Sequence, residues 1–176
     1  MPKVLAEPKA KAPVLPLKLV TDHQELAHIV RGLQSQGKTV VFMTGCFEIL
    51  RPGHIRALRD ARSRGDYLVI GVFGDDAVRE LKGAGRPLQG ALERVEVLSA
   101  IDCIDYVTVV KEAAADQALL TIRPNVVAWG TEYKENTVPE RDTIQSYGGR
   151  IQIVGDRKKR STADLLRKAK TLRRVV

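Results

Sequence analysis

Short apolar runs, each bounded by polar residues or glycine, recur along the chain. One of them, Leu68-Val69-Ile70-Gly71-Val72, shows no alternation of apolar and polar positions. Continuous runs of this kind are typical of parallel strands that are covered on both faces. We therefore predict strands at residues 39–44, 67–73, 106–110, 125–129 and 150–154.

The segments between these runs have the spacing of amphipathic helices. In residues 22–35, for example, Leu26, Val30 and Leu33 fall on one face of a helix. Strands that alternate with helices indicate an α/β fold, here a doubly wound parallel sheet of about five strands with helices on both faces. The further predicted helices are residues 53–64, 75–81, 91–101, 116–122, 140–147 and 161–172.

The two ends of the chain differ in composition from the middle. Residues 1–17 are rich in Lys, Ala and Pro and lack periodicity, so we expect a disordered basic tail before a single domain at 18–176. The net charge is +8. Residues 1–20 carry four Lys and one Glu, and residues 156–176 carry nine Lys or Arg and two Asp, so the rest of the chain is close to neutral. Basic character confined to the ends, without aromatic platforms, argues against a nucleic-acid partner.

Other features of the whole sequence narrow the class of protein further. No apolar run approaches the roughly 20 residues of a membrane span, so we expect no membrane partner. The first residues lack the apolar core of a signal peptide, which predicts a cytoplasmic protein. The two cysteines, Cys46 and Cys103, form no disulfide framework and no metal-ligand spacing includes them.

The most informative stretch follows the first predicted strand. Thr44-Gly45-Cys46-Phe47 makes a glycine turn, and Arg51-Pro52-Gly53-His54 opens a helix. Backbone N–H groups at such a turn and helix start point at a bound anion, and the helix dipole favours negative charge there. The imidazole of His54 can donate to the same anion. Glycines also follow the second and fourth strands, at Gly74 and Gly130, where the chain can approach a ligand at the switch point of the sheet.

A second candidate anion site lies before the last predicted helix. Ser161 and Thr162 suit an N-cap, and the cations of Lys158, Lys159 and Arg160 precede them. A simple cap and a phosphate site are compatible interpretations, because a cap residue still presents its backbone N–H to an anion.

Four other charged residues are less distinctive by themselves. Lys82, Arg86 and Arg94 have the character of ordinary exposed charges, and Asp75 could simply cap the helix that it begins.

The order of these landmarks resembles that of the small nucleotidylyltransferases. It runs from Gly45-Cys46-Phe47 and Pro52-Gly53-His54, through Gly85-Arg86-Pro87 and Glu93-Arg94, to Arg160-Ser161-Thr162. Within that superfamily the chain is most similar to the heptose-1-phosphate adenylyltransferase domain of ADP-heptose synthases. Glycerol-3-phosphate cytidylyltransferase is a more distant relative.

The chain departs from the family pattern at several positions. Arg51 stands where the first histidine of the signature is expected, Glu48 replaces an Asp, and Thr44 replaces an Asn. After the fourth strand, Trp129 and Glu132 replace the usual Lys and Asp around the glycine. These changes lie in the nucleotide and acceptor pockets that the resemblance implies.

The resemblance implies a role for each landmark. The expected catalytic residues are His54, Arg51 and Lys82. Asp75, Arg86 and Arg94 are expected to bind the acceptor substrate. The expected nucleotide-binding residues are Thr44, Gly45, Cys46, Phe47, Gly53, His54, Gly130, Arg160, Ser161 and Thr162.

The implied chemistry is attack of an acceptor phosphate oxygen on the α-phosphorus of a nucleoside triphosphate, with release of pyrophosphate. The nucleophile is already an anion, so positioning and charge stabilisation suffice. Mg²⁺ would accompany the triphosphate, with no metal site made by the protein alone. The resemblance also allows a homodimer.

Three functions are consistent with the sequence. The first is an adenylyltransferase that uses ATP and a heptose 1-phosphate. The second is a cytidylyltransferase that uses CTP and glycerol phosphate or a similar polyol phosphate. The third is a non-catalytic relative that binds nucleotide, which the change at Arg51 favours.

Overall fold

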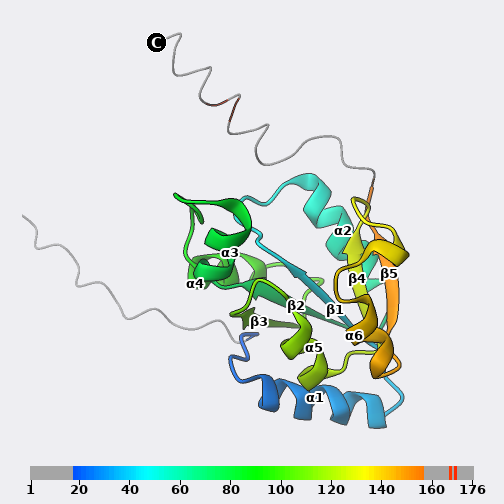
Figure 1. The fold of residues 1–176 in the computed structure, drawn as a ribbon. Helices are drawn as coiled ribbons and strands as arrows, with labels where there is room; N and C mark the ends of the chain where they lie inside the picture. Colours follow the sequence, from blue (N-terminus) through cyan, green and yellow to red (C-terminus); the bar gives the residue numbers. More distant parts are fainter. Residues whose placement is uncertain (1–17, 157–166, 168, 170–176) are drawn as a thin grey trace, which may run out of the picture.

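The core of the molecule is a five-stranded parallel sheet in the order β3-β2-β1-β4-β5. Figure 1 shows this sheet in the computed structural model, which describes residues 18–156, 167 and 169. The strands are β1 (Val40–Gly45), β2 (Tyr67–Phe73), β3 (Tyr106–Val110), β4 (Val126–Gly130) and β5 (Arg150–Val154).

Helices connect the strands and cover both faces of the sheet (Figure 1). Apolar side chains of α1, α3, α5 and α6 pack on one face, and those of α2 and α4 pack on the other. The helices are α1 (His23–Ser35), α2 (Pro52–Arg62), α3 (Asp75–Lys82), α4 (Ala91–Ser99), α5 (Asp116–Ile122), α6 (Arg141–Ser146) and the short 3₁₀ helix η1 (Glu135–Thr137).

Strand β1 illustrates why its apolar run is continuous. Val40 and Phe42 are buried among the residues of one helical layer, whereas Val41 between them is buried in the other layer. Successive side chains of a strand point to opposite faces, so a strand with two covered faces needs apolar residues at every position. The predicted doubly wound α/β fold is confirmed.

The sheet order reverses at β1, and this positions the ligand-binding edge. The chain runs from β1 to β2 and β3 on one side, and then returns to place β4 and β5 on the other. Because β1 pairs in parallel with β4, their carboxyl ends at Gly45 and Gly130 lie at the same edge. Ligands of open α/β sheets bind at such a switch point.

Element boundaries differ from the predictions by at most two residues. The second helix begins at Pro52 and not at Gly53, because Arg51 already occupies its N-cap in an extended conformation. The fourth ends at Ser99 and not at residue 101. The helix η1 follows β4 and was not predicted, since its sequence Glu-Asn-Thr has no apolar period.

The ends of the described chain add two details. Residues 18–20 run beside β3, where Leu19 forms a parallel bridge with Val107. The predicted tail at 1–17 and the predicted helix at 161–172 lie outside the described residues, apart from residues 167 and 169. Among the described helices, none is both long and apolar enough to cross a bilayer.

Candidate nucleotide-binding site

The glycine turn after β1 packs tightly on the ring of Phe47. A Cβ atom at Gly45 would lie 2.9 Å from this ring, so a larger residue would displace the ring or the turn. Phe47 itself is buried and has a φ of 47°, in the left-handed region. Its ring meets the imidazole of His54 edge-on, with centroids 6.1 Å apart. The turn therefore holds the chain close to the first turn of α2.

The start of α2 is open to a ligand of negative charge. Its first turn holds no acidic residue, and Pro52 occupies the first helical positions. A Cβ atom placed on Gly53 would have no atom within 4 Å, so there is space beside this residue. The positive end of the helix dipole and this space favour an anion.

Arg51 folds back over His54 at the same helix start. Its backbone N–H lies 3.2 Å from Nδ1 of His54, and its guanidinium Nη2 lies 3.0 Å from Nε2. A neutral imidazole has only one acceptor nitrogen, so only one of these contacts can be a hydrogen bond. Which of the two is the hydrogen bond depends on which ring nitrogen of His54 carries the proton. The structure thus brings two of the three predicted catalytic residues together.

Arg94 is buried between the glycine turn, α3 and α4. Its side chain donates to the carbonyl oxygens of Cys46 (2.6 Å) and Gln89 (3.0 Å) and to the carboxylate of Asp75 (2.8 Å). Only 1% of the residue is exposed. Its donors are engaged by protein groups in this state, and its predicted contact with substrate stays a prediction. Asp75 is likewise engaged by Arg94, and it does not cap α3, whose N-cap is Gly74.

Arg86 reaches the turn from the other direction. Its guanidinium forms an ion pair with Glu48, whose second oxygen accepts the backbone N–H of Leu88 at 2.8 Å. Glu48 is 5% exposed. Sequence reasoning singled out Arg86 but gave Glu48 no role, although the acidic position of the family signature was the available signal.

Lys82 ends α3 and is exposed to solvent. Its charge nevertheless acts on the glycine turn. Burial raises the pKa of the Cys46 thiol, and Lys82 is the strongest influence in the opposite direction. Arg94 and Arg86 act in the same direction as Lys82, whereas the Glu48 carboxylate acts with burial and raises the pKa. Three cations and one carboxylate thus act on the thiol of the glycine turn.

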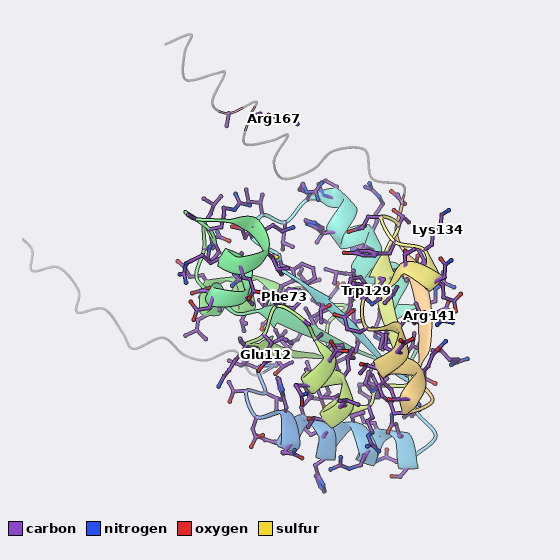
Figure 2. All side chains as sticks on the ribbon, in the orientation of Figure 1. Phe73, Glu112, Trp129, Lys134, Arg141 and Arg167 are labelled. Atoms are coloured by element: carbon purple, nitrogen blue, oxygen red, sulfur yellow. The ribbon has the colours of Figure 1, made fainter. Side chains whose placement is uncertain are left out.

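The end of β4 lies at the same edge of the sheet as the glycine turn. Figure 2 labels Trp129 on this strand, and its ring lies edge-on to Tyr133 with centroids 4.6 Å apart. The carboxylate of Glu132 lies against the α-carbon of Gly130. The hydroxyl of Thr131 donates to the carbonyl oxygen of Asp156 at 2.8 Å. A carboxylate thus stands beside the glycine that was predicted to bind nucleotide.

A family model provides the decisive comparison. The model described as cytidylyltransferase-like matches residues 42–173, which include the glycine turn, the start of α2 and the end of β4. The chain belongs to the cytidylyltransferase-like family. The superfamily expected from the sequence is confirmed.

Curated relatives of this cytidylyltransferase-like chain are much longer proteins. Bifunctional protein HldE of Geobacter sulfurreducens is 44% identical over 143 residues, which are 81% of this chain and 29% of that protein. Bifunctional protein HldE of Geotalea uraniireducens is 40% identical over 146 residues, 83% of this chain and 30% of that protein. The chain spans about three-tenths of the length of these relatives.

Solved structures of low sequence identity share the fold. A lipopolysaccharide core biosynthesis protein from Thermoplasma volcanium has a TM-score of 0.61 at 24% identity, covering 69% of this chain and all of that one. Pantoate-beta-alanine ligase from Francisella tularensis, complexed with beta-gamma ATP and beta-alanine, has a TM-score of 0.53 at 12% identity, covering 86% of this chain and 76% of that one.

The predicted site residues that the structure describes thus fall into two groups. A continuous cluster lies around the turn, and Gly130 lies at the neighbouring strand end. Arg160, Ser161 and Thr162 lie outside the described residues. The cluster contains Thr44, Gly45, Cys46, Phe47, Arg51, Gly53, His54, Asp75, Lys82, Arg86 and Arg94.

Proposed function

We propose that this chain is a nucleotidyltransferase that joins a nucleoside monophosphate to a sugar phosphate and releases pyrophosphate. ATP and a heptose 1-phosphate are the first substrate pair. The proposal draws on the resemblance to heptose-1-phosphate adenylyltransferase domains and on the similarity to bifunctional HldE proteins. The observation that carries it is the contact between the Arg51 guanidinium and the His54 imidazole at the start of α2.

The proposed reaction is the nucleotidyl transfer that the resemblance implies. An oxygen of the acceptor phosphate attacks the α-phosphorus, the bond between that phosphorus and the α,β-bridging oxygen breaks, and pyrophosphate leaves with the electron pair. His54 and Arg51 donate to the oxygens on which negative charge increases. Arg51 is always charged and so needs no proton from solution to do this.

The acceptor side is assigned to the residues beyond the turn. Lys82 supplies positive charge near Cys46, and Arg86 meets the acceptor phosphate. Arg94 has a positioning role, since its bonds to Cys46 and Asp75 fix the turn against α3. No general base is required, because the acceptor phosphate is already ionised.

The donor set of the site indicates how Mg²⁺ would be held. No group of three His, Cys, Asp or Glu that could hold a metal ion occurs within the described part of the chain. The phosphate oxygens of the nucleotide would therefore be its main ligands, with water completing the shell. When bound, the ion would offset negative charge on the triphosphate.

A second candidate is a cytidylyltransferase that uses CTP and a polyol phosphate. Membership of the cytidylyltransferase-like family is consistent with this candidate as well as with the first. A homodimer and a cytoplasmic location, both expected from the sequence, stay predictions.

The test is pyrophosphate release with ATP or CTP, each combined with heptose 1-phosphate or glycerol 3-phosphate, in the presence of Mg²⁺. We expect the highest turnover with ATP and heptose 1-phosphate. His54→Ala should lower it by about 100-fold or more, the usual cost of one preorganised donor. Pyrophosphate release with none of the pairs, together with an increase in the melting temperature on adding ATP, would instead identify a non-catalytic nucleotide binder.

A further inference from the structure

The loop between α3 and α4 is tied to the glycine turn by two buried charges. Residues 83–90 contain no helix or strand. From the turn, Glu48 accepts hydrogen bonds from the Arg86 guanidinium and the Leu88 backbone. From α4, Arg94 donates to Gln89 of the loop and to Cys46 of the turn. We call these four contacts the turn–loop clamp.

Arg94 and Glu48 hold different parts of the loop. Arg94 joins backbone to backbone, because both loop and turn contribute carbonyl oxygens to it. Glu48 instead holds a side chain, the guanidinium of Arg86, whose side chain is 19% exposed while that of Glu48 is 4% exposed. A carboxylate that pairs with a guanidinium fixes both the position and the plane of that group. Glu48 therefore determines where the cation of Arg86 points.

The remaining donors of Arg86 are consistent with a further partner. One nitrogen of its guanidinium, Nη2, contacts Glu48. Its Nε is buried and has no hydrogen-bond partner among the described residues. A buried donor without a partner lowers the stability of the protein. A bound group that accepts a hydrogen bond from this Nε would remove that cost.

We infer that Glu48 is a positioning residue for the acceptor: it orients Arg86 so that the guanidinium meets the acceptor phosphate beside the glycine turn. This inference rests on the proposed function. The nucleotide side depends less on Glu48, since Arg94 holds the carbonyl of Cys46 independently.

The chain length of Glu48 is part of the inference. An aspartate, the usual residue of the family at this position, has one methylene less and could not make both contacts without movement of the loop. The extra methylene allows the turn to hold this loop at its present distance. The length of Glu48 thus fits the distance between the turn and the loop, and its difference from the family aspartate does not disrupt the site.

The decisive variant is Glu48→Gln. The Gln carbonyl can still accept the Leu88 N–H, so the loop remains attached, but its amide group would place two donors against Arg86. We expect KM for the acceptor to rise by roughly 10- to 100-fold, the cost of a charged hydrogen bond, while KM for ATP changes by less than about twofold. The control is Asp76→Asn, which removes an exposed ion pair with Arg79 on the nearby α3 and should alter neither KM.

A double-mutant cycle tests whether Glu48 acts through Arg86. Arg86→Ala should raise KM for the acceptor, and adding Glu48→Gln to it should cause little further increase. Equal increases of both KM values in Glu48→Gln, or fully additive effects in the double variant, would overturn the positioning role.

Binding of heptose 1-phosphate, measured by calorimetry without nucleotide, separates this inference from the proposed function. Wild-type protein that binds the sugar phosphate but releases no pyrophosphate would overturn the proposed function. Weaker binding by Glu48→Gln would then still support the positioning role of Glu48. Wild-type protein that does not bind it would overturn both. Turnover by the wild type, together with an unchanged acceptor KM and an unchanged acceptor affinity in Glu48→Gln, would overturn the positioning role alone.

Discussion

Arg51 is one of the residues at which this chain departs from the pattern of its family, and the structure gives it a defined place. It is the N-cap of α2, and its guanidinium folds back to the imidazole of His54. An arginine is longer than a histidine, and folding back is how the longer side chain stays at the helix start. A guanidinium therefore lies at the helix start that the family signature would fill with a histidine.

At this scale we predict that Arg51→Ala lowers kcat/KM by roughly 5- to 150-fold, equivalent to about 1–3 kcal/mol for the loss of a charged hydrogen bond. Arg51→His should not exceed the wild type. The control is Arg59→Ala, which removes an exposed cation from the last turn of the same helix. Unaltered turnover in Arg51→Ala, measured by pyrophosphate release, would show that Arg51 does not replace the missing histidine.

Residue roles divide clearly into those that sequence can predict and those that it cannot. Gly45 and His54 were predicted because a glycine turn and a helix start are local features. The burial of Arg94 and Glu48 was not predicted, because it depends on partners that are distant in the sequence, such as Cys46, 48 positions from Arg94, and Leu88, 40 positions from Glu48. A charged residue in an amphipathic helix looks exposed until its acceptors are known.

At the scale of elements, the packing of β5 against α2 depends on one glycine. Gly155 follows β5 with a φ of 85°, and a Cβ atom there would lie 2.8 Å from Cβ of Ala57 on α2. Its N–H donates to the Asp60 carboxylate at 2.8 Å. The carboxyl end of β5 is thus held against α2, the helix whose start is the candidate phosphate site.

We predict that Gly155→Ala destabilises the protein by at least about 2 kcal/mol, because it combines an unfavourable left-handed conformation with a clash against α2. The melting temperature should fall by roughly 4–10 °C for a chain of this size. Gly32→Ala is a matched control for which we expect the opposite change in stability. A Cβ atom at Gly32 in α1 meets no atom within 4 Å, so alanine should raise stability by roughly 0.5–1 kcal/mol. Equal effects of both variants would contradict this packing.

Strands were the easiest elements to predict, and short irregular segments were the hardest. The strand β2 (Tyr67–Phe73) coincides with its predicted range, because an unbroken apolar run has few other uses. The helix η1 has no such signal and is held by local bonds, such as Lys134 N–H to the Thr137 hydroxyl at 2.9 Å. Such bonds leave no periodic pattern in the sequence, so the helix could not be predicted.

At the scale of the molecule, the beginning of the described chain is part of the sheet edge. The backbones of Lys18 and Val20 exchange hydrogen bonds with Val107 at 2.8 and 2.9 Å. The Lys18 ammonium also donates to the carbonyl of Ile101 at 2.8 Å. Residues 18–20 therefore cover the outer edge of β3.

We predict that deleting residues 1–17 leaves the melting temperature and nucleotide affinity nearly unchanged, because a Lys/Ala/Pro segment buries little. Deleting residues 1–20 should lower the melting temperature by roughly 5–10 °C, since three hydrogen bonds of about 1 kcal/mol each and part of the apolar edge are lost. Calorimetry on both truncations checks this. A large loss in the shorter deletion would mean that the tail itself docks on the domain.

The order of the elements along the chain also has a consequence during synthesis. Every residue of the turn–loop clamp precedes Val110, the end of β3, and β1, β2 and β3 are neighbours in the sheet. All of these residues are therefore synthesised before β4. Because a domain generally folds as a unit, however, the sheet is complete only when Val126–Gly130 has paired with β1 and Arg150–Val154 has paired with β4. The predicted nucleotide-binding residues Gly130, Arg160, Ser161 and Thr162 are thus the last part of the candidate site to be translated.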